Sequence, residues 1–430
     1  MQVLKSSVMM LVLLWLPLSS VLAQDPSATD GPELQNASVD GVEDDTPDEV
    51  EDDTPDIETE TTVGYTEAKT GLKVAGDLRP IYDYFDIEGR DGVSLSDDTF
   101  GFRGRLRADF GLTEEVHVGA RLAGRCFTDG CDPEFVFQSA PDTRNGLRGG
   151  QFTFDELYLH WFRTERGSFA FGRLQTRFVL RGGVYAKSLD RNNSNNTNIN
   201  WTDGMQATYH AQNGWHSSFV FERNASDGTG SIRHGSLDFD DGKARNTYFV
   251  GFENIERWGP IVQRGFDVSY LPNSLLTDGD PNGRREDYWG VVGRLAARWP
   301  QRTTGIRLRV GTEIGYAPKT AAPAAAPFNI AEESDGLAWD MVASIMDFQP
   351  RHSIGINYAR TGAGWLLSPQ FRPNEQLFEI RYMWRPAGLP FFEMRVRWRE
   401  DLEQPIGTLQ KREAFDMYFR LTWAFTLKTR

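Results

Sequence analysis

Long apolar runs are scarce in this chain of 430 residues, whose mean hydropathy is −0.48. A membrane-spanning helix needs about 20 consecutive apolar residues, and no stretch beyond the first 22 residues approaches that length. The exception is the shorter run Val8–Leu18, which follows Lys5 and precedes the small residue Ala23. A basic start, an apolar core and a small-residue cleavage site indicate a secretory signal peptide over residues 1–23. No cysteine stands at the cleavage site, where the next residue is Gln24, which argues against a lipoprotein.

Cysteine is also scarce, with only Cys126 and Cys131 in the whole chain. Two cysteines with no histidine close by fall short of the four ligands of a structural zinc site, so we expect no metal and no cofactor. An exported chain meets an oxidising compartment, so a small Cys126–Cys131 disulfide is one expectation. The alternative is a pair of free thiols.

Basic residues are absent from residues 25–60, although this segment carries 15 acidic ones. The net charge of −15 therefore belongs to this segment, because residues 61–430 carry −15 + 15 − 1 = −1 once Lys5 is counted. Such a polar, acidic stretch buries too little apolar surface to offset its ordering entropy. We interpret residues 24–68 as a disordered periplasmic segment.

Alternation of apolar and charged residues dominates the sequence from Gly71 onward. Phe102 and Leu106 alternate with arginines, as do Val396 and Trp398. Successive side chains of a strand point to opposite faces, so each predicted strand has one apolar and one charged face. This is an all-β pattern, in a soluble sandwich or in a membrane barrel.

Two features favour the membrane barrel. Tryptophans recur near strand ends, as in the aromatic girdles at membrane interfaces: Trp161, Trp201, Trp289, Trp299, Trp384 and Trp398. Short connections also alternate with long ones, among them residues 85–99, 175–200 and 366–374. Counting predicts a transmembrane antiparallel β-barrel of about 16 strands over residues 69–430, in keeping with the even numbers of closed barrels.

One segment carries a resemblance to a family. An acidic residue opens an aromatic strand, Asp155–Phe162, and after a short turn a second strand, Gly167–Arg173, ends in Gly-Arg. This arrangement resembles the porins of Gram-negative bacteria. The resemblance implies a water-filled channel for small hydrophilic solutes in the outer membrane, a homotrimer in contact with outer-membrane lipid, and a third long loop that folds inward to narrow the pore. That constriction loop contains Arg177, Arg181, Lys187 and Arg191.

The charged face of the barrel would line the lumen, and we count seventeen basic against ten acidic residues on it. Most of the basic ones fall on the first three and last three predicted strands, which are neighbours in a closed barrel. The pore-lining candidates are Arg103, Arg105, Arg107, Arg121, Arg125, Arg395, Arg397 and Arg399. Rows of arginine attract anions, so we expect a preference for phosphate-like or carboxylate solutes. The alternative is that these arginines pair with lumen carboxylates and brace the barrel.

Other functions find less support. A barrel enzyme such as a lipase or protease needs a nucleophile with an oriented histidine, and neither a Gly-x-Ser-x-Gly motif nor another nucleophile motif occurs. A structural barrel or a carrier of apolar compounds stays open as an alternative, although rows of arginine disfavour an apolar lumen. No nucleic-acid recognition motif is present, and the basic residues alternate within strands. We therefore expect a channel rather than an enzyme.

Overall fold

The computed structural model describes residues 71–428, except for gaps in several connections. The gaps are residues 129, 138–148, 165, 177, 182–187, 191–198, 200, 225–235, 240–241, 278–283, 301–305, 322–335 and 369. The expected signal peptide and acidic segment lie outside the described residues. No helix among the described residues is long and apolar enough to cross a bilayer.

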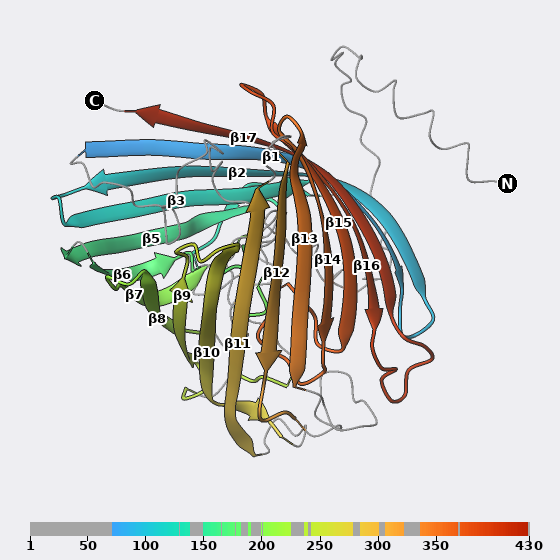
Figure 1. Cartoon of the computed structure of the whole chain (residues 1–430). Coiled ribbons are helices and arrows are strands. Elements are labelled where there is room, and N and C mark those ends of the chain that lie inside the picture. The colour runs from blue at the N-terminus through green and yellow to red at the C-terminus, as the bar shows by residue number, and fades with distance from the viewer. Residues whose placement is uncertain are drawn as a thin grey trace, which may run out of the picture. The chain divides into compact units, whose positions relative to one another are not determined.

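Sixteen strands form the wall of a closed antiparallel barrel, which confirms the predicted fold (Figure 1). Each strand pairs with its neighbours in the chain, and β1 pairs with β17 to close the wall. The strands are β1 (Gly71–Glu88), β2 (Ser94–Gly111), β3 (Val116–Phe127), β5 (Gln151–Thr164), β6 (Gly167–Leu174), β7 (Thr202–His210), β8 (Trp215–Arg223), β9 (Asn246–Asn254), β10 (Ile261–Leu276), β11 (Arg285–Pro300), β12 (Arg307–Tyr316), β13 (Leu337–Gln349), β14 (His352–Thr361), β15 (Glu375–Trp384), β16 (Phe391–Asp401) and β17 (Glu413–Lys428). The two-residue strand β4 (Glu134–Phe135) adds to β5 in parallel.

The two ends of the barrel differ in their connections. Short turns join the strands at one end, which we call the short-turn end, and longer loops join them at the other, the long-loop end. The prediction of a long loop at residues 85–99 is wrong. Strands β1 and β2 extend through most of this range, and only residues 89–93 connect them. Val93 N donates to Asp91 Oδ1, and Gly92 adopts φ +79°, so the chain reverses in a tight turn.

The wall has an apolar outer face and a charged inner face. On β2, Leu106 is 50% exposed while Arg103 is 1% exposed, because alternate side chains point to opposite sides. Five of the six expected girdle tryptophans lie outside and are 39–45% exposed. Trp201 is the exception and corrects the prediction. It lies inside, with Arg173 over its ring at 4.3 Å and its Nε1 donating to Asp203.

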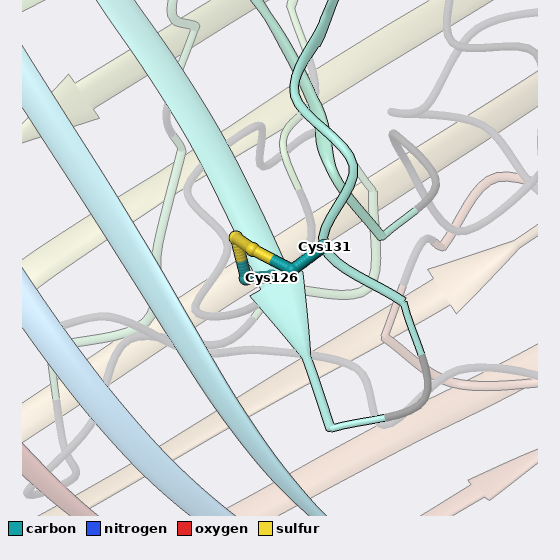
Figure 2. The surroundings of a disulfide bond; sticks show 2 residues. All are labelled: Cys126 and Cys131. Atoms are coloured by element: carbon teal, nitrogen blue, oxygen red, sulfur yellow. A yellow bond between two sulfur atoms is a disulfide. The ribbon is translucent and has the colours of Figure 1, made fainter. Parts of the chain in front are cut away.

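The two cysteines form a disulfide at the long-loop end of the barrel. Figure 2 shows Cys126 near the end of β3 and Cys131 in the loop that follows. Their Cα atoms are 4.7 Å apart, within the range a disulfide requires. The bond closes a small ring at the start of a long loop.

Candidate functional site: the charged interior of the barrel

The eight pore-lining candidates lie on three strands, β2, β3 and β16, which β1 and β17 join into one continuous part of the wall. We call this part the arginine wall. It spans β16, β17, β1, β2 and β3 and carries the eight arginines named from the sequence, together with Arg79 and Arg420. The structure therefore brings these residues together. It also pairs most of them with carboxylates, and the pairing follows from the register between strands.

Asp77 is the centre of the first cluster. Its carboxylate accepts from Arg105 Nε at 2.7 Å and from Arg103 Nη2 at 3.0 Å, and Arg79 Nε lies 3.2 Å away. The register explains the convergence, because Asp77 on β1 stands directly opposite Arg105 on β2. Three guanidinium groups thus converge on one carboxylate.

In the neighbouring cluster on β2, β3 and β5 the numbers of arginines and carboxylates are closer to equal. Arg121 makes a bidentate pair with Asp155 at 2.9 and 2.8 Å and also contacts Glu156 at 2.8 Å. Arg107 lies 2.9 Å from Asp109. Arginine favours such carboxylate pairs because its planar group donates two parallel hydrogen bonds. These arginines brace the wall, as the alternative interpretation expected.

Arg125 contacts an aromatic ring as well. Its guanidinium lies 5.1 Å from the centre of the Phe127 ring, within the range of a cation–π contact. Phe127 is the last residue of β3, so this contact lies close to the long-loop end of the wall.

In the cluster on β16 and β17 two arginines also converge on one carboxylate, and Glu379 on β15 stands opposite Arg397. Arg395 Nη2 and Arg397 Nε both donate to Asp416, at 2.9 and 2.7 Å. Arg395 also lies over the ring of Tyr418 at 4.2 Å. Arg399 Nη1 donates to Glu375 on β15 at 2.7 Å. Two guanidinium groups therefore share the carboxylate of Asp416.

Glu393 forms a further bridge across three strands. It accepts from Arg420 on β17 at 2.5 Å and lies 3.0 Å from Arg381 on β15. Tyr418 also donates its hydroxyl to Glu393. These groups are fully buried, and a buried charge is stable only when it is paired and hydrogen-bonded.

The expected constriction loop, between β6 and β7, extends into the interior as far as the structure describes it. Arg177, Lys187 and Arg191 lie outside the described residues. Arg181 is described: its backbone N–H donates to Gln263 Oε1 at 2.7 Å and its Nε lies 3.3 Å from Glu253. Both partners belong to strands β9 and β10, so this part of the loop lies against the inner side of the wall.

The same loop is fixed further along by contacts at Ser188–Asp190. Leu189 N donates to Glu313 on β12 at 2.8 Å, and Trp365 Nε1 donates to Leu189 O at the same distance. Ser188 N donates to Gln370. The loop that leaves β6 therefore reaches β12 and the loop between β14 and β15.

That second loop, residues 362–374, contains the long loop predicted at 366–374, but all of its described residues are buried rather than exposed. Trp365 belongs to the largest apolar cluster among the described residues of the interior. Cβ atoms added at Gly290 and Gly315 would lie 3.3 and 2.8 Å from its ring, so glycine makes room for the indole. Other members of the cluster are Leu189, Leu237, Phe239, Leu271, Leu275, Tyr288, Leu366, Leu367 and Phe371.

Sequence reasoning missed this cluster and therefore overstated the polarity of the interior. One signal was present, the apolar run Trp365–Leu367 at the start of the loop predicted at 366–374. An apolar run in a surface loop is unfavourable unless something covers it. The interior thus has an arginine wall on one side and an apolar cluster against β10 to β15.

Comparison with known proteins identifies the fold. No protein-family model matches the sequence, and no curated protein sequence matches it. Solved structures do match. They include OprB of Pseudomonas putida (TM-score 0.54, 11% identity, 83% of this chain and 94% of that chain) and OccK8 (OprE) of Pseudomonas aeruginosa (TM-score 0.51, 12% identity, 83% and 98%). OccD3 (OpdP) of Pseudomonas aeruginosa matches with a TM-score of 0.52, 10% identity and coverage of 84% and 93%. At this identity the likeness concerns the fold alone, and it confirms the prediction of a porin-like β-barrel.

Proposed function

We propose that the chain forms a water-filled channel in the outer membrane of a Gram-negative bacterium, where it passes small hydrophilic solutes and prefers anions. The fold supports a channel, because a barrel of 16 or more strands is wide enough to enclose an aqueous lumen. The apolar outer face with its tryptophan girdle fits a lipid environment. The proposal includes a homotrimer, no enzymatic activity, and a short-turn end that faces the periplasm.

The anion preference rests on one observation, the convergence of Arg79, Arg103 and Arg105 on the carboxylate of Asp77. Arginine stays protonated at any physiological pH, so the cluster keeps a positive excess. Asp416 with its two arginines repeats the arrangement on the far side of β1. A fixed positive excess along a pore raises the local concentration of anions. Phosphate and carboxylate solutes suit it best, because the planar guanidinium binds them through two hydrogen bonds.

A reversal potential measured in a planar bilayer under a potassium chloride gradient tests both parts of the proposal. We expect steady conductance and a potential of the sign that marks an anion-preferring pore. Replacing Arg103, Arg105 and Arg107 together by Ser is expected to move the potential toward cation preference. The change should shrink as salt rises from 0.1 to 1 M, because the Debye length falls from about 10 to about 3 Å.

Arg264→Ser is the matched control, since Arg264 lies on the outer face beside Trp258 and Trp215 and should leave selectivity unchanged. Absence of conductance would contradict the channel. A wild-type pore that already prefers cations would contradict only the anion preference.

Two further parts of the proposal concern processing and assembly. We infer that residues 1–23 are removed on export and that residues 24–68 lie in the periplasm. The mass of protein extracted from outer membranes tests the first point, because it should correspond to a chain that starts at Gln24. Light scattering of the detergent-solubilised protein tests the trimer, and a monomer mass would contradict it.

A further inference from the structure

Four of the six histidines lie on the inner face of the barrel near its short-turn end. They form two pairs in which each histidine stands directly opposite the other on an adjacent strand: His117 with His160 on β3 and β5, and His210 with His216 on β7 and β8. Facing side chains in an antiparallel pair have Cβ atoms about 5 Å apart, so both imidazoles of a pair can reach one ligand.

The pair His210 and His216 flanks the short turn between β7 and β8. The ring centres are 4.2 Å apart and the ring planes lie at 69°. Both residues are half-buried, so solvent reaches them from the lumen. A metal bonded to two imidazoles at about 2 Å each holds the two nitrogens about 3 Å apart. With ring centres 4.2 Å apart, the site requires both side chains to rotate until one nitrogen of each ring lies within that span.

Two carboxylates stand beside this pair. Glu253 on β9 is directly opposite His216, so that His210, His216 and Glu253 form a row across three strands. Glu253 accepts from Gln263 Nε2 at 2.9 Å and pairs with Arg181. Glu256 lies over the turn, because a Cβ added at Gly214 would be 2.1 Å from its Cδ. A carboxylate next to two imidazoles supplies the negative charge that a divalent cation requires.

We propose that His210 and His216 bind a divalent transition-metal ion at the short-turn mouth of the pore, with Glu256 as the third protein ligand. Neutral imidazole binds Cu²⁺ more tightly than Ni²⁺ or Zn²⁺. Among these divalent ions we therefore expect the site to bind Cu²⁺ most tightly. Among the described residues no group of three or more His, Cys, Asp or Glu side chains could hold a metal as it stands. The proposed site therefore requires Glu256 to turn from its place over Gly214 toward the two imidazoles. Water completes the coordination.

The second pair provides a matched comparison. His117 and His160 are 9% and 5% exposed, and Phe162 packs against both rings, with ring centres 5.3 and 4.1 Å away. A metal would have to displace this aromatic contact and would reach the rings less easily from water. The more exposed pair, with a carboxylate over its turn, is therefore the metal site.

Electron paramagnetic resonance of the full, tag-free protein with one equivalent of Cu²⁺ tests the proposal. We expect the splitting of two imidazole nitrogens in the wild type and in the double variant His117→Ala, His160→Ala. His210→Ala and His216→Ala should each lower Cu²⁺ affinity at least tenfold and lose that splitting. Full affinity in either variant, or loss of the signal only in the comparison variant, would overturn the proposal.

A second measurement needs no substitution. Diethyl pyrocarbonate modifies accessible histidines, and mass spectrometry locates the modified residues. Cu²⁺ should protect His210 and His216 but not His352, which lies on the outer face beside Trp384. Equal modification of His210 and His216 with and without Cu²⁺ would contradict the site. Neither measurement depends on conductance, so the outcome is independent of the proposed channel function.

Discussion

Asp190, in the loop between β6 and β7, lies 3.4 Å from the guanidinium of Arg294 on β11, 104 residues away in the chain. Arg294 also contacts Asp267 at 2.6 Å and Glu313 at 2.7 Å. All four side chains are 2% exposed or less. One guanidinium group therefore holds three buried carboxylates from two strands and a loop, and it ties the loop to the wall.

Arg294→Met is expected to release this loop. Removing one partner of a buried ion pair costs about 3–5 kcal/mol, because the remaining charges are left uncompensated in a low-dielectric interior. Here three carboxylates would repel one another and the loop would leave the wall. We expect noisier single-channel currents with an altered conductance, and a barrel that unfolds at lower denaturant concentration.

Arg264→Met serves as the control for this variant, because Arg264 lies on the outer face and contacts no interior carboxylate in the described part of the chain. Currents of Arg294→Met that match the wild type in size and noise would show that the loop is held by its other contacts, such as the hydrogen bond from Trp365 to Leu189.

Asp77→Asn is expected to raise the anion preference of the pore. The asparagine keeps a hydrogen-bond acceptor near Arg103 and Arg105 but removes the negative charge on which these two groups and Arg79 converge. The positive excess of the cluster therefore grows by one charge. The reversal potential should move in the direction opposite to that of the triple arginine variant, and less so in 1 M salt.

Asp98→Asn is the control for Asp77→Asn. It tests whether the loss of any carboxylate shifts the reversal potential. Asp98 is exposed near the long-loop end of β2, on the outer side of the wall. Its loss should leave the reversal potential nearly unchanged. Equal shifts in the two variants would show that total charge, rather than the cluster at Asp77, sets the selectivity.

The wall of the barrel was predictable from the sequence because each strand carries its own signal. Each strand has an apolar outer face and a polar inner face. The alternation of exposed and buried side chains seen at Leu106 and Arg103 therefore recurs from strand to strand. The predicted number of about 16 strands matches the number in the wall of the barrel. Periodicity within one strand is sufficient for this result.

Contacts between strands were less predictable, because they depend on register. Arg103 and Arg105 were expected on the inner face, but their sharing of Asp77 follows from the pairing of β1 with β2. The facing of His210 and His216 depends in the same way on the short turn between β7 and β8. No local pattern marks either arrangement, so the sequence led us to expect no metal site.

The interior loops were the least predictable part. The apolar run around Trp365 is favourable in a loop only because the closed barrel offers an apolar surface that includes Tyr288 and Leu189. These residues are far apart in the chain, and only the three-dimensional structure brings them together. The resemblance to porins indicated which loop folds inward, but the sequence did not indicate which residues that loop contacts.

Replacing Cys126 and Cys131 together by Ser is expected to lower stability modestly and leave conductance unchanged. The disulfide spans a sequence separation of five, and closing so short a ring stabilises a protein by about 2 kcal/mol through the unfolded state. The bond lies at the end of β3 and leaves the arginine wall in place. Urea unfolding in detergent micelles measures the first effect and planar-bilayer recording the second. A changed selectivity would show that the loop after β3 reaches the pore.

Ile356→Arg is expected to hinder insertion of the barrel into a bilayer. Ile356 lies midway along β14 on the outer face and is 48% exposed, where a lipid-facing side chain is expected. An arginine at the midplane of a lipid-facing strand costs about 2–4 kcal/mol, because the charge must leave water or draw water into the bilayer. Folding into phosphatidylcholine vesicles, followed by urea titration, should show a loss of stability in that range.

Leu409→Arg is the control, because Leu409 is 78% exposed in the loop between β16 and β17, beyond the ends of the strands. A cost near zero at Leu409 with a large one at Ile356 would place β14 in lipid, whereas equal small costs would mean that water or another protein surface covers this face.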